Sequence, residues 1–467
     1  MQEQTMTEPV SNKRIIKYLP YVIFAVIITV FHIICYAVFE DDARVIEQLP
    51  SSLWDIVLHP IATTCSGWSS RILINPPIWI FCAIDYRIWM IMDILIWLYI
   101  YWIIGKLCVK EMTTEKSCVL MLLLLLFPID TSMSVGCIVT SMTYIWPAAA
   151  ALTACMSIRN MLDGKKTGII KSILYILLLL YATNKEELSV MLTMVFFFAV
   201  IRLVIDRKSN KKTDWLIVIQ FIVSFGSVLF HMLSSGNRDR AVTENIAQVT
   251  GLAGLLDKLD MTIFAQYQRL LFDFDFLFIS MCLILFTLIC LVTKGIIPKL
   301  VAVLPLIVFV LSVCADGYVI KLFFDVSDNY MPMFAGYYIS EGKYGMATAW
   351  IQLAIYIVIT YSICYSIVKL GGRNKRTLLM LGILVAGFCG RLVVCFGGHG
   401  WQRYSRTYTF FYFGIILVTY IIVNLQLGKL SIRRKDILLT VLIMTAMFSQ
   451  AFAYVNMIGY LSENGYW

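Results

Sequence analysis

Long apolar segments recur along the whole chain, and they constrain its fold more than any other feature of the sequence. Of its 467 residues, 60% are hydrophobic and only 14% are charged. A soluble globular protein has roughly half apolar and a quarter charged residues, so this composition excludes a water-soluble enzyme or a disordered scaffold. A helix needs about 20 residues to cross a bilayer. The pattern therefore predicts an all-α, polytopic transmembrane helix bundle of about thirteen spans.

The predicted spans leave no room for a separate soluble domain, so we expect residues 1–467 to form a single integral membrane domain. These spans are 15–39, 87–107, 117–129, 142–158, 168–183, 187–205, 213–233, 273–293, 297–314, 346–368, 377–396, 408–427 and 436–456. A shorter apolar stretch, 72–84, contains two consecutive prolines, and we expect it to be re-entrant or interfacial.

Basic residues are concentrated in alternate connecting segments. Most of the 38 lysines and arginines lie in these segments, and the net charge is +9. Because Lys and Arg favour the cytoplasmic side of a membrane, the pattern predicts a cytoplasmic N-terminus and extracytoplasmic acidic loops. This topology explains the positive charge without a nucleic-acid partner.

The predicted outer loops are about 40–86, 234–272, 315–345 and 397–407. Within the first, the stretch 43–60 has an apolar face interrupted by Pro50, which favours an interfacial helix. The basic connections contain no GxGxxG or GxxxxGK[ST] pattern, so any chemistry is expected on the outer face.

Asp41 and Asp42 directly follow the first span, and they are the candidate catalytic residues. A carboxylate at this boundary can take a proton from an acceptor hydroxyl as the hydroxyl attacks a sugar. The same pair can bind a divalent cation such as Mg²⁺ or Mn²⁺ through its oxygens, although no cofactor is certain. The alternative interpretation is a solvated acidic helix end.

Arginines near the predicted outer ends of spans suit a lipid-linked phosphate, because guanidinium groups match phosphate geometry. The alternative for these side chains is contact with anionic headgroups. Asp93, inside the second span, could be a partner for one of them. The candidate phosphate-binding residues are Arg71, Arg238, Arg240, Arg391, Arg403 and Arg406.

Aromatic and polar residues at the same predicted boundary are candidates for binding the acceptor or the sugar. Aromatic residues at this depth are more often interface anchors, and a polar turn can simply be a solvated corner, so these alternatives stay open. The candidates are Trp68, Tyr144, Trp146, Asn184, Glu186, Glu187 and His399.

The order of these features resembles the C-type (GT-C) glycosyltransferases, polytopic enzymes that use polyprenyl-phosphate sugars. More narrowly, the chain is similar to the serotype-converting glucosyltransferases and their bacterial relatives. The features that carry the resemblance are Asp41-Asp42, Gly67-Trp68-x-x-Arg71, Tyr144-x-Trp146-Pro147, Asn184-x-Glu186, Gly236-Asn237-x-x-Arg240 and Arg406 before a span.

The resemblance implies a glycosyltransferase of the bacterial cytoplasmic (inner) membrane. It would move one sugar from a polyprenyl phosphate to an extracytoplasmic cell-envelope glycan or lipid, with Asp41 or Asp42 as general base and inversion at the anomeric carbon. Two alternatives stay open from the residues themselves. One is an outer-leaflet polysaccharide polymerase or ligase, and the other is a lipid-linked sugar transporter.

Overall fold

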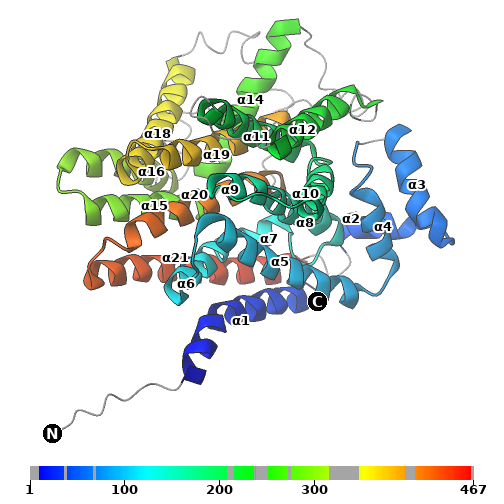
Figure 1. Ribbon diagram of the computed structural model, residues 1–467, viewed down its shortest axis with the longest axis horizontal. Helices are drawn as coiled ribbons and strands as arrows, with labels where there is room; N and C mark the ends of the chain where they lie inside the picture. The colour runs from blue at the N-terminus through cyan, green and yellow to red at the C-terminus, as the bar shows by residue number, and fades with distance from the viewer. Residues whose placement is uncertain are drawn as a thin grey trace.

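The apolar segments form helices that pack against one another along their lengths (Figure 1). The computed structural model describes residues 10–35, 39–66, 70–207, 215–235, 237, 251–271, 275–314, 347–394 and 405–463. Within these residues there are helices and no β-strand. The predicted all-α class is therefore confirmed for the part of the chain that the structure describes.

The N-terminal half is built around helix α8 (Ile138–Ala154), which packs against α5 (Tyr86–Cys108) and α10 (Ile169–Ala182). Helix α1 (Val10–Ile34) lies against α5 and α6 (Thr114–Leu124). The C-terminal helix also approaches α1, since Phe31 stacks on Tyr454 with ring centroids 4.2 Å apart. The short helices are α7 (Ile129–Ser132) and α9 (Met156–Leu162).

The C-terminal half is built around α19 and α20, which pack against each other and run between the two ends of the bundle. Helix α11 packs against α12 and α19, and α15 packs against α16, α20 and α21. The bounds are α11 (Glu186–Arg207), α12 (Trp215–Leu233), α14 (Gly251–Leu271), α15 (Phe276–Val292), α16 (Ile296–Cys314), α18 (Ala347–Gly371), α19 (Lys375–Leu392), η3 (Ser405–Tyr408), α20 (Thr409–Leu427) and α21 (Ile432–Glu463).

Among the described residues, seven helical segments are long and apolar enough to cross a membrane. They are Tyr86–Cys108, Ile138–Leu162, Glu186–Ile205, Trp215–Leu233, Trp350–Gly371, Ser405–Leu427 and Ile432–Glu463. Helices α14 and α15 would form an eighth span if this pair, bent by 70°, is counted as one. Large apolar side chains such as Ile222, Met232 and Phe448 are exposed on these helices, as expected for surfaces that face lipid. The number of thirteen spans stays a prediction, because α6 and α10 have only 11 and 14 residues.

The predicted first outer loop consists largely of three short helices, α2 (Glu40–Glu47), α3 (Leu53–Ser66) and α4 (Asn75–Ala83), which lie together at one side of the bundle (Figure 1). Pro50 separates α2 from α3, as expected for a residue that cannot continue a helix. Helix α4 has nine residues, or about 14 Å of rise, which is too short to cross a bilayer core of about 30 Å. The interfacial position of this region stays a prediction.

The predicted loop 234–272 contains the 21-residue helix α14. The leucines at 252, 255, 256 and 259 follow a helical period. The charged residues between them lower the mean hydropathy of the segment, so hydropathy alone did not identify this helix. The predicted loop 315–345 lies outside the described residues, as does most of 397–407.

Candidate functional site

Asp41 and Arg406 form an ion pair across the fold. Arg406 Nη1 donates to Asp41 Oδ2 at 2.7 Å, although the two residues are 365 positions apart. Asp41 lies in the first turn of α2, and Arg406 lies in η3, directly before α20. Their side chains are 33% and 36% exposed, so a ligand from outside can reach both groups.

Asp42 points in a different direction, and α8 holds its carboxylate. Backbone amides of Ile138 and Val139 donate to the two carboxylate oxygens at 3.0 and 2.9 Å, and Asp42 is 2% exposed. An acidic side chain at a helix N-terminus satisfies amides that have no partner within the helix. Burial raises the pKa of Asp42, against the opposing effect of these hydrogen bonds. Asp42 therefore anchors α2 to α8, while Asp41 stays accessible.

Tyr144 of α8 lies near a second group of charges and within electrostatic range of Arg406. The Lys185 ammonium lies 4.8 Å from the centroid of the Tyr144 ring, and the Phe410 ring packs 5.9 Å from the same ring. Tyr144 also belongs to the electrostatic surroundings of both Arg71 and Arg406. Tyr144 is 7% exposed, and its ring is already covered by a cation, so it does not offer an open face for a sugar.

The second group of charges is neutral as a whole. Lys185 Nζ lies 3.1 Å from a Glu186 oxygen and 2.6 Å from a Glu187 oxygen, and Arg71 Nε donates to Glu186 at 3.3 Å. Burial and Arg71 act to lower the pKa of Lys185, but the two carboxylates outweigh them and raise it above its usual value. Burial also acts to lower the pKa of Arg71, and Glu186 likewise raises it. Both cations therefore keep their charge.

We call Asp41, Arg406, Tyr144, Lys185, Glu186, Glu187 and Arg71 together the Asp41 cluster. Its members come from α2, the segment before α4, α8, the α10–α11 turn, the first turn of α11 and η3. Lys185 is 2% exposed, whereas Glu186 and Arg71 are 15% and 22% exposed. Only Asp41, Arg406, Glu186 and Arg71 of this cluster are therefore accessible to a ligand.

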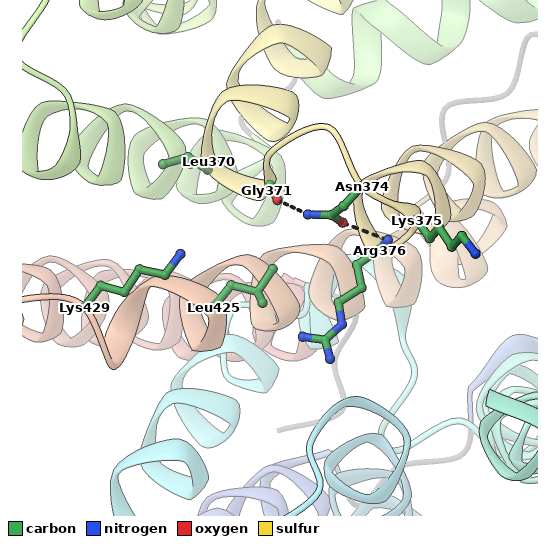
Figure 2. Close-up of a pocket in the computed structure, with 7 residues that line it drawn as sticks. All are labelled: Leu370, Gly371, Asn374, Lys375, Arg376, Leu425 and Lys429. Carbon is green, nitrogen blue, oxygen red and sulfur yellow. Dashed lines mark hydrogen bonds between the residues drawn. The ribbon is translucent and has the colours of Figure 1, made fainter. Parts of the chain in front are cut away.

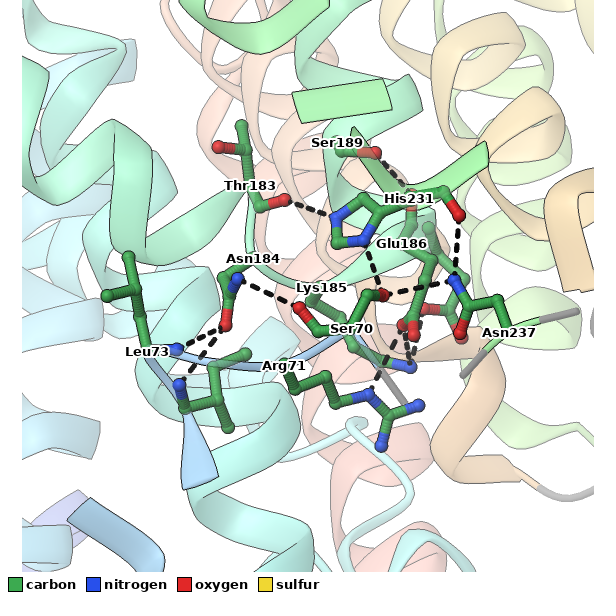
Figure 3. A network of polar contacts seen from close by, with 12 residues as sticks. Ser70, Arg71, Leu73, Thr183, Asn184, Lys185, Glu186, Ser189, His231 and Asn237 are labelled. Atoms are coloured by element: carbon green, nitrogen blue, oxygen red, sulfur yellow. Dashed lines mark hydrogen bonds and ion pairs between the residues drawn. The ribbon is translucent and has the colours of Figure 1, made fainter. Parts of the chain in front are cut away.

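Asn184 has a positioning role. Its side-chain oxygen accepts hydrogen bonds from the backbone amides of Leu73 and Ile74, and its side-chain amide donates a hydrogen bond to the Ser70 carbonyl (Figure 3). The Ser70 hydroxyl in turn contacts His231 Nδ1 at 2.7 Å and accepts a hydrogen bond from Asn237 at 3.0 Å. This network fixes the segment that carries Arg71, so Asn184 acts on the site through that segment.

Trp146 belongs to a different buried group. Its indole nitrogen donates to Asp93 at 2.9 Å, and His32 Nε2 lies 3.1 Å from the other Asp93 oxygen. Ser141 donates to Asp93 as well. The prediction that Asp93 pairs with an arginine was wrong among the described residues, because α1 and α8, both packed on α5, supply these neutral or titratable donors instead.

Arg391 is buried at the C-terminal end of α19, with its guanidinium carbon 4.7 Å from the centroid of the Tyr408 ring. A Cβ at the preceding Gly390 would lie 2.8 Å from the Glu187 carbonyl oxygen, so the glycine allows α19 to approach α11 closely. Arg391 therefore lies near the Asp41 cluster, but its contact with Tyr408 is within the protein core. The remaining candidates, Trp68, Arg238, Arg240, His399 and Arg403, lie outside the described residues.

The sequence interpretation missed Arg269 and Asp275. Arg269 of α14 donates to Ser405 at 2.5 Å, next to Arg406, and lies 3.9 Å from the Asp275 carboxylate. Tyr412 donates to the same carboxylate at 2.5 Å. Arg269 could have been found from the amphipathic periodicity of α14, the helix that carries it. Mean hydropathy did not identify this segment as a helix.

The described residues contain no group of three or more His, Cys, Asp or Glu side chains placed to hold a metal ion. Comparison with known proteins identifies no matching family model, curated protein or solved structure.

Proposed function

We propose that this protein is a glycosyltransferase that moves one sugar from a polyprenyl-phosphate donor to a cell-envelope glycan or lipid. In this proposal about thirteen segments span the bacterial cytoplasmic membrane, with the N-terminus in the cytoplasm. The Asp41 cluster then faces the extracytoplasmic side, where the lipid-linked donor and the acceptor meet.

The observation that carries the proposal is the ion pair between Asp41 and Arg406. Transfer from a sugar phosphate needs a base for the incoming hydroxyl and a cation for the departing phosphate, placed within one sugar of each other. The guanidinium group of Arg406 has five N–H donors in a planar fork that matches the geometry of a phosphate, and one of these donors orients the Asp41 carboxylate. Both side chains are about one-third exposed.

The reaction then follows from these two groups. Asp41 takes the proton of the acceptor hydroxyl as its oxygen forms a bond to the anomeric carbon of the donor. The bond from that carbon to the phosphate oxygen breaks, and the electron pair stays on the polyprenyl phosphate. Arg406 stabilises the charge that the phosphate gains, an interaction that is stronger in the transition state than in the ground state. Direct displacement without a covalent intermediate inverts the anomeric carbon.

Asp42 is unsuited to the role of base, because two backbone amides occupy its oxygens and its side chain is inaccessible. Glu186 and Arg71, which are partly exposed, form the proposed acceptor side of the site. Arg71, with Glu186 as its partner, can donate hydrogen bonds to sugar hydroxyls.

The test uses the purified full-length protein with a panel of polyprenyl-phosphate sugars labelled in the sugar, and with cell-envelope glycan as acceptor. We expect transfer of label with release of free polyprenyl phosphate. Asp41→Asn keeps the shape of the side chain but removes the base, and should lower the rate about 10²- to 10⁴-fold. Asp55→Asn, at an exposed carboxylate of α3, is the matched control and should keep the wild-type rate.

Two results would decide against the proposal. If Asp41→Asn keeps more than a tenth of the activity, the carboxylate is not the base, and the polymerase or ligase alternative gains support. If labelled lipid crosses a membrane containing the protein and no free polyprenyl phosphate forms, the protein is a transporter.

A further inference from the structure

A pocket of about 390 Å³ lies at the end of the bundle remote from the Asp41 cluster. Helix α20 has 19 residues, or about 28 Å of rise, and it separates Arg406 from this pocket. The turn between α18 and α19 and the turn between α20 and α21 form its walls (Figure 2). We call it the basic pocket, and it is lined by Leu370, Gly371, Asn374, Lys375, Arg376, Leu425 and Lys429.

The two turns are rigidly built. Gly372 has a φ of +76°, a left-handed conformation that favours glycine, and its carbonyl accepts the Thr377 hydroxyl at 2.5 Å. The Asn374 side chain accepts the backbone amides of Arg376 and Thr377 and so caps α19. Gln426 of α20 donates to the Leu370 carbonyl of α18 at 2.5 Å and ties the two walls together. The pocket therefore exists before any ligand binds.

Three cations line this pocket, Lys375, Arg376 and Lys429. In the part of the chain that the structure describes, neither Lys375, Arg376 nor Lys429 forms an ion pair. The segments 369–376 and 429–436 together hold eight basic residues and one acid, Asp436. One of these basic residues, Lys435, pairs with Glu115 of α6. The positive end of the α19 dipole adds to the same potential. An anion is the ligand that this charge distribution favours.

Apolar side chains next to the cations favour a lipid over a free ion. Leu370 and Leu425 line the pocket itself. One turn beyond the basic residues, Leu378 is 72% exposed on α19 and Ile432 is 81% exposed on α21. A phosphate held by the basic side chains would leave the acyl chains of the lipid free to cover these apolar surfaces.

We propose that the basic pocket binds the phosphate group of an anionic phospholipid in the leaflet at this end of the bundle. Basic residues next to membrane helices recognise anionic headgroups in this way. Lipid binding here is independent of any catalytic role of Asp41.

Native mass spectrometry of the full-length protein in neutral detergent, titrated with phosphatidylglycerol, tests the proposal. The variant Lys375→Gln, Arg376→Gln, Lys429→Gln should bind this lipid at least about tenfold more weakly than the wild type, because it lacks three cations at the headgroup. The matched control changes three exposed lysines outside the pocket, Lys166→Gln, Lys171→Gln and Lys294→Gln, and should stay within about twofold. Phosphatidylcholine should bind equally to all three proteins.

Equal loss of binding in the pocket variant and the control would overturn the proposal, because charge alone would then explain it. Full displacement of phosphatidylglycerol by an equal concentration of inorganic phosphate would overturn the choice of a lipid. If the triple variant does not fold, the single variant Arg376→Gln decides the question, with an expected loss of about two- to fivefold. Wild-type affinity in that single variant would contradict the proposal.

Discussion

The two ends of the α19–α20 pair both carry charge, but they use it differently. In the Asp41 cluster, each cation has a carboxylate partner: Arg406 pairs with Asp41, and Lys185 and Arg71 pair with Glu186 and Glu187. In the basic pocket, the three cations are exposed and have no ion-pair partner among the described residues.

The difference reflects burial. A charge removed from water needs a partner, because otherwise its desolvation costs several kcal/mol. An exposed cation stays hydrated, so the lack of an ion-pair partner costs it little free energy. Its electrostatic field reaches external anions within a Debye length of about 10 Å. The charges of the Asp41 cluster are therefore part of the packing that defines the site, whereas those of the basic pocket are available for a partner outside the chain.

The largest expected effect on stability is at Lys185. Lys185→Met removes the buried cation that pairs with Glu186 and with Glu187, and the Glu187 side chain is only 6% exposed. The substitution should therefore lower the free energy of unfolding by about 3–5 kcal/mol. Thermal unfolding in detergent measures this loss, with the exposed Lys166→Met as control. A loss below about 1 kcal/mol would mean that the two carboxylates become hydrated or protonated when the cation is removed. The difference in burial between the charges of the two ends would then matter less than we infer.

Arg406 should affect catalysis more than stability. Arg406→Gln removes the proposed phosphate contact and should lower kcat about 10²- to 10³-fold, as loss of one strong transition-state donor does. Because the pair with Asp41 is about one-third exposed, its contribution to stability should be below about 1 kcal/mol. Initial rates and unfolding measured on the same preparation separate the two effects. A variant with normal rates would show that the pair is only structural.

A smaller effect is expected at Asp42. Asp42→Asn replaces one of the two acceptors at the start of α8 and should cost about 1 kcal/mol, the value of a helix cap. Because burial raises the folded-state pKa of Asp42, the folded protein binds a proton more readily than the unfolded chain. The stabilisation that results from this raised pKa is complete at pH values below the pKa of Asp42 in the unfolded chain. It is lost as the pH rises through the pKa of Asp42 in the folded protein.

Wild-type stability should therefore fall relative to Asp42→Asn as pH rises through that range, and unfolding measured at several pH values checks the sign. The opposite slope would mean that the amide hydrogen bonds, and not burial, determine the pKa of Asp42.

Much of the fold followed from hydropathy, and part of the site followed from charge at predicted helix ends. Helix α20, which follows Arg406 and η3, coincides with the predicted segment 408–427, because an apolar run of this length has few other solutions. Helix α14 was missed, and Arg269 with it, since an amphipathic helix has low mean hydropathy.

Side-chain direction could not be predicted. Asp41 and Asp42 are neighbours in the sequence, yet one faces Arg406 and the other faces the amides of α8. That division depends on the rotation of α2 about its axis, which tertiary contacts with α8 and η3 determine. The partners of Asp93 were mispredicted for the same reason, because α1 brings His32 to it across 61 positions.

The smallest effect is expected at the basic pocket in the absence of anionic lipid. The triple variant Lys375→Gln, Arg376→Gln, Lys429→Gln should unfold within about 0.5 kcal/mol of the wild type per substitution, since exposed side chains without partners contribute little. Phosphatidylglycerol at about 100 times its dissociation constant should then stabilise the wild type by about 2.7 kcal/mol and the variant by much less. A loss of several kcal/mol without lipid would show that these cations also have partners within the chain. Both ends of the bundle would then use charge for packing, and the distinction between a structural and an available set of charges would no longer hold.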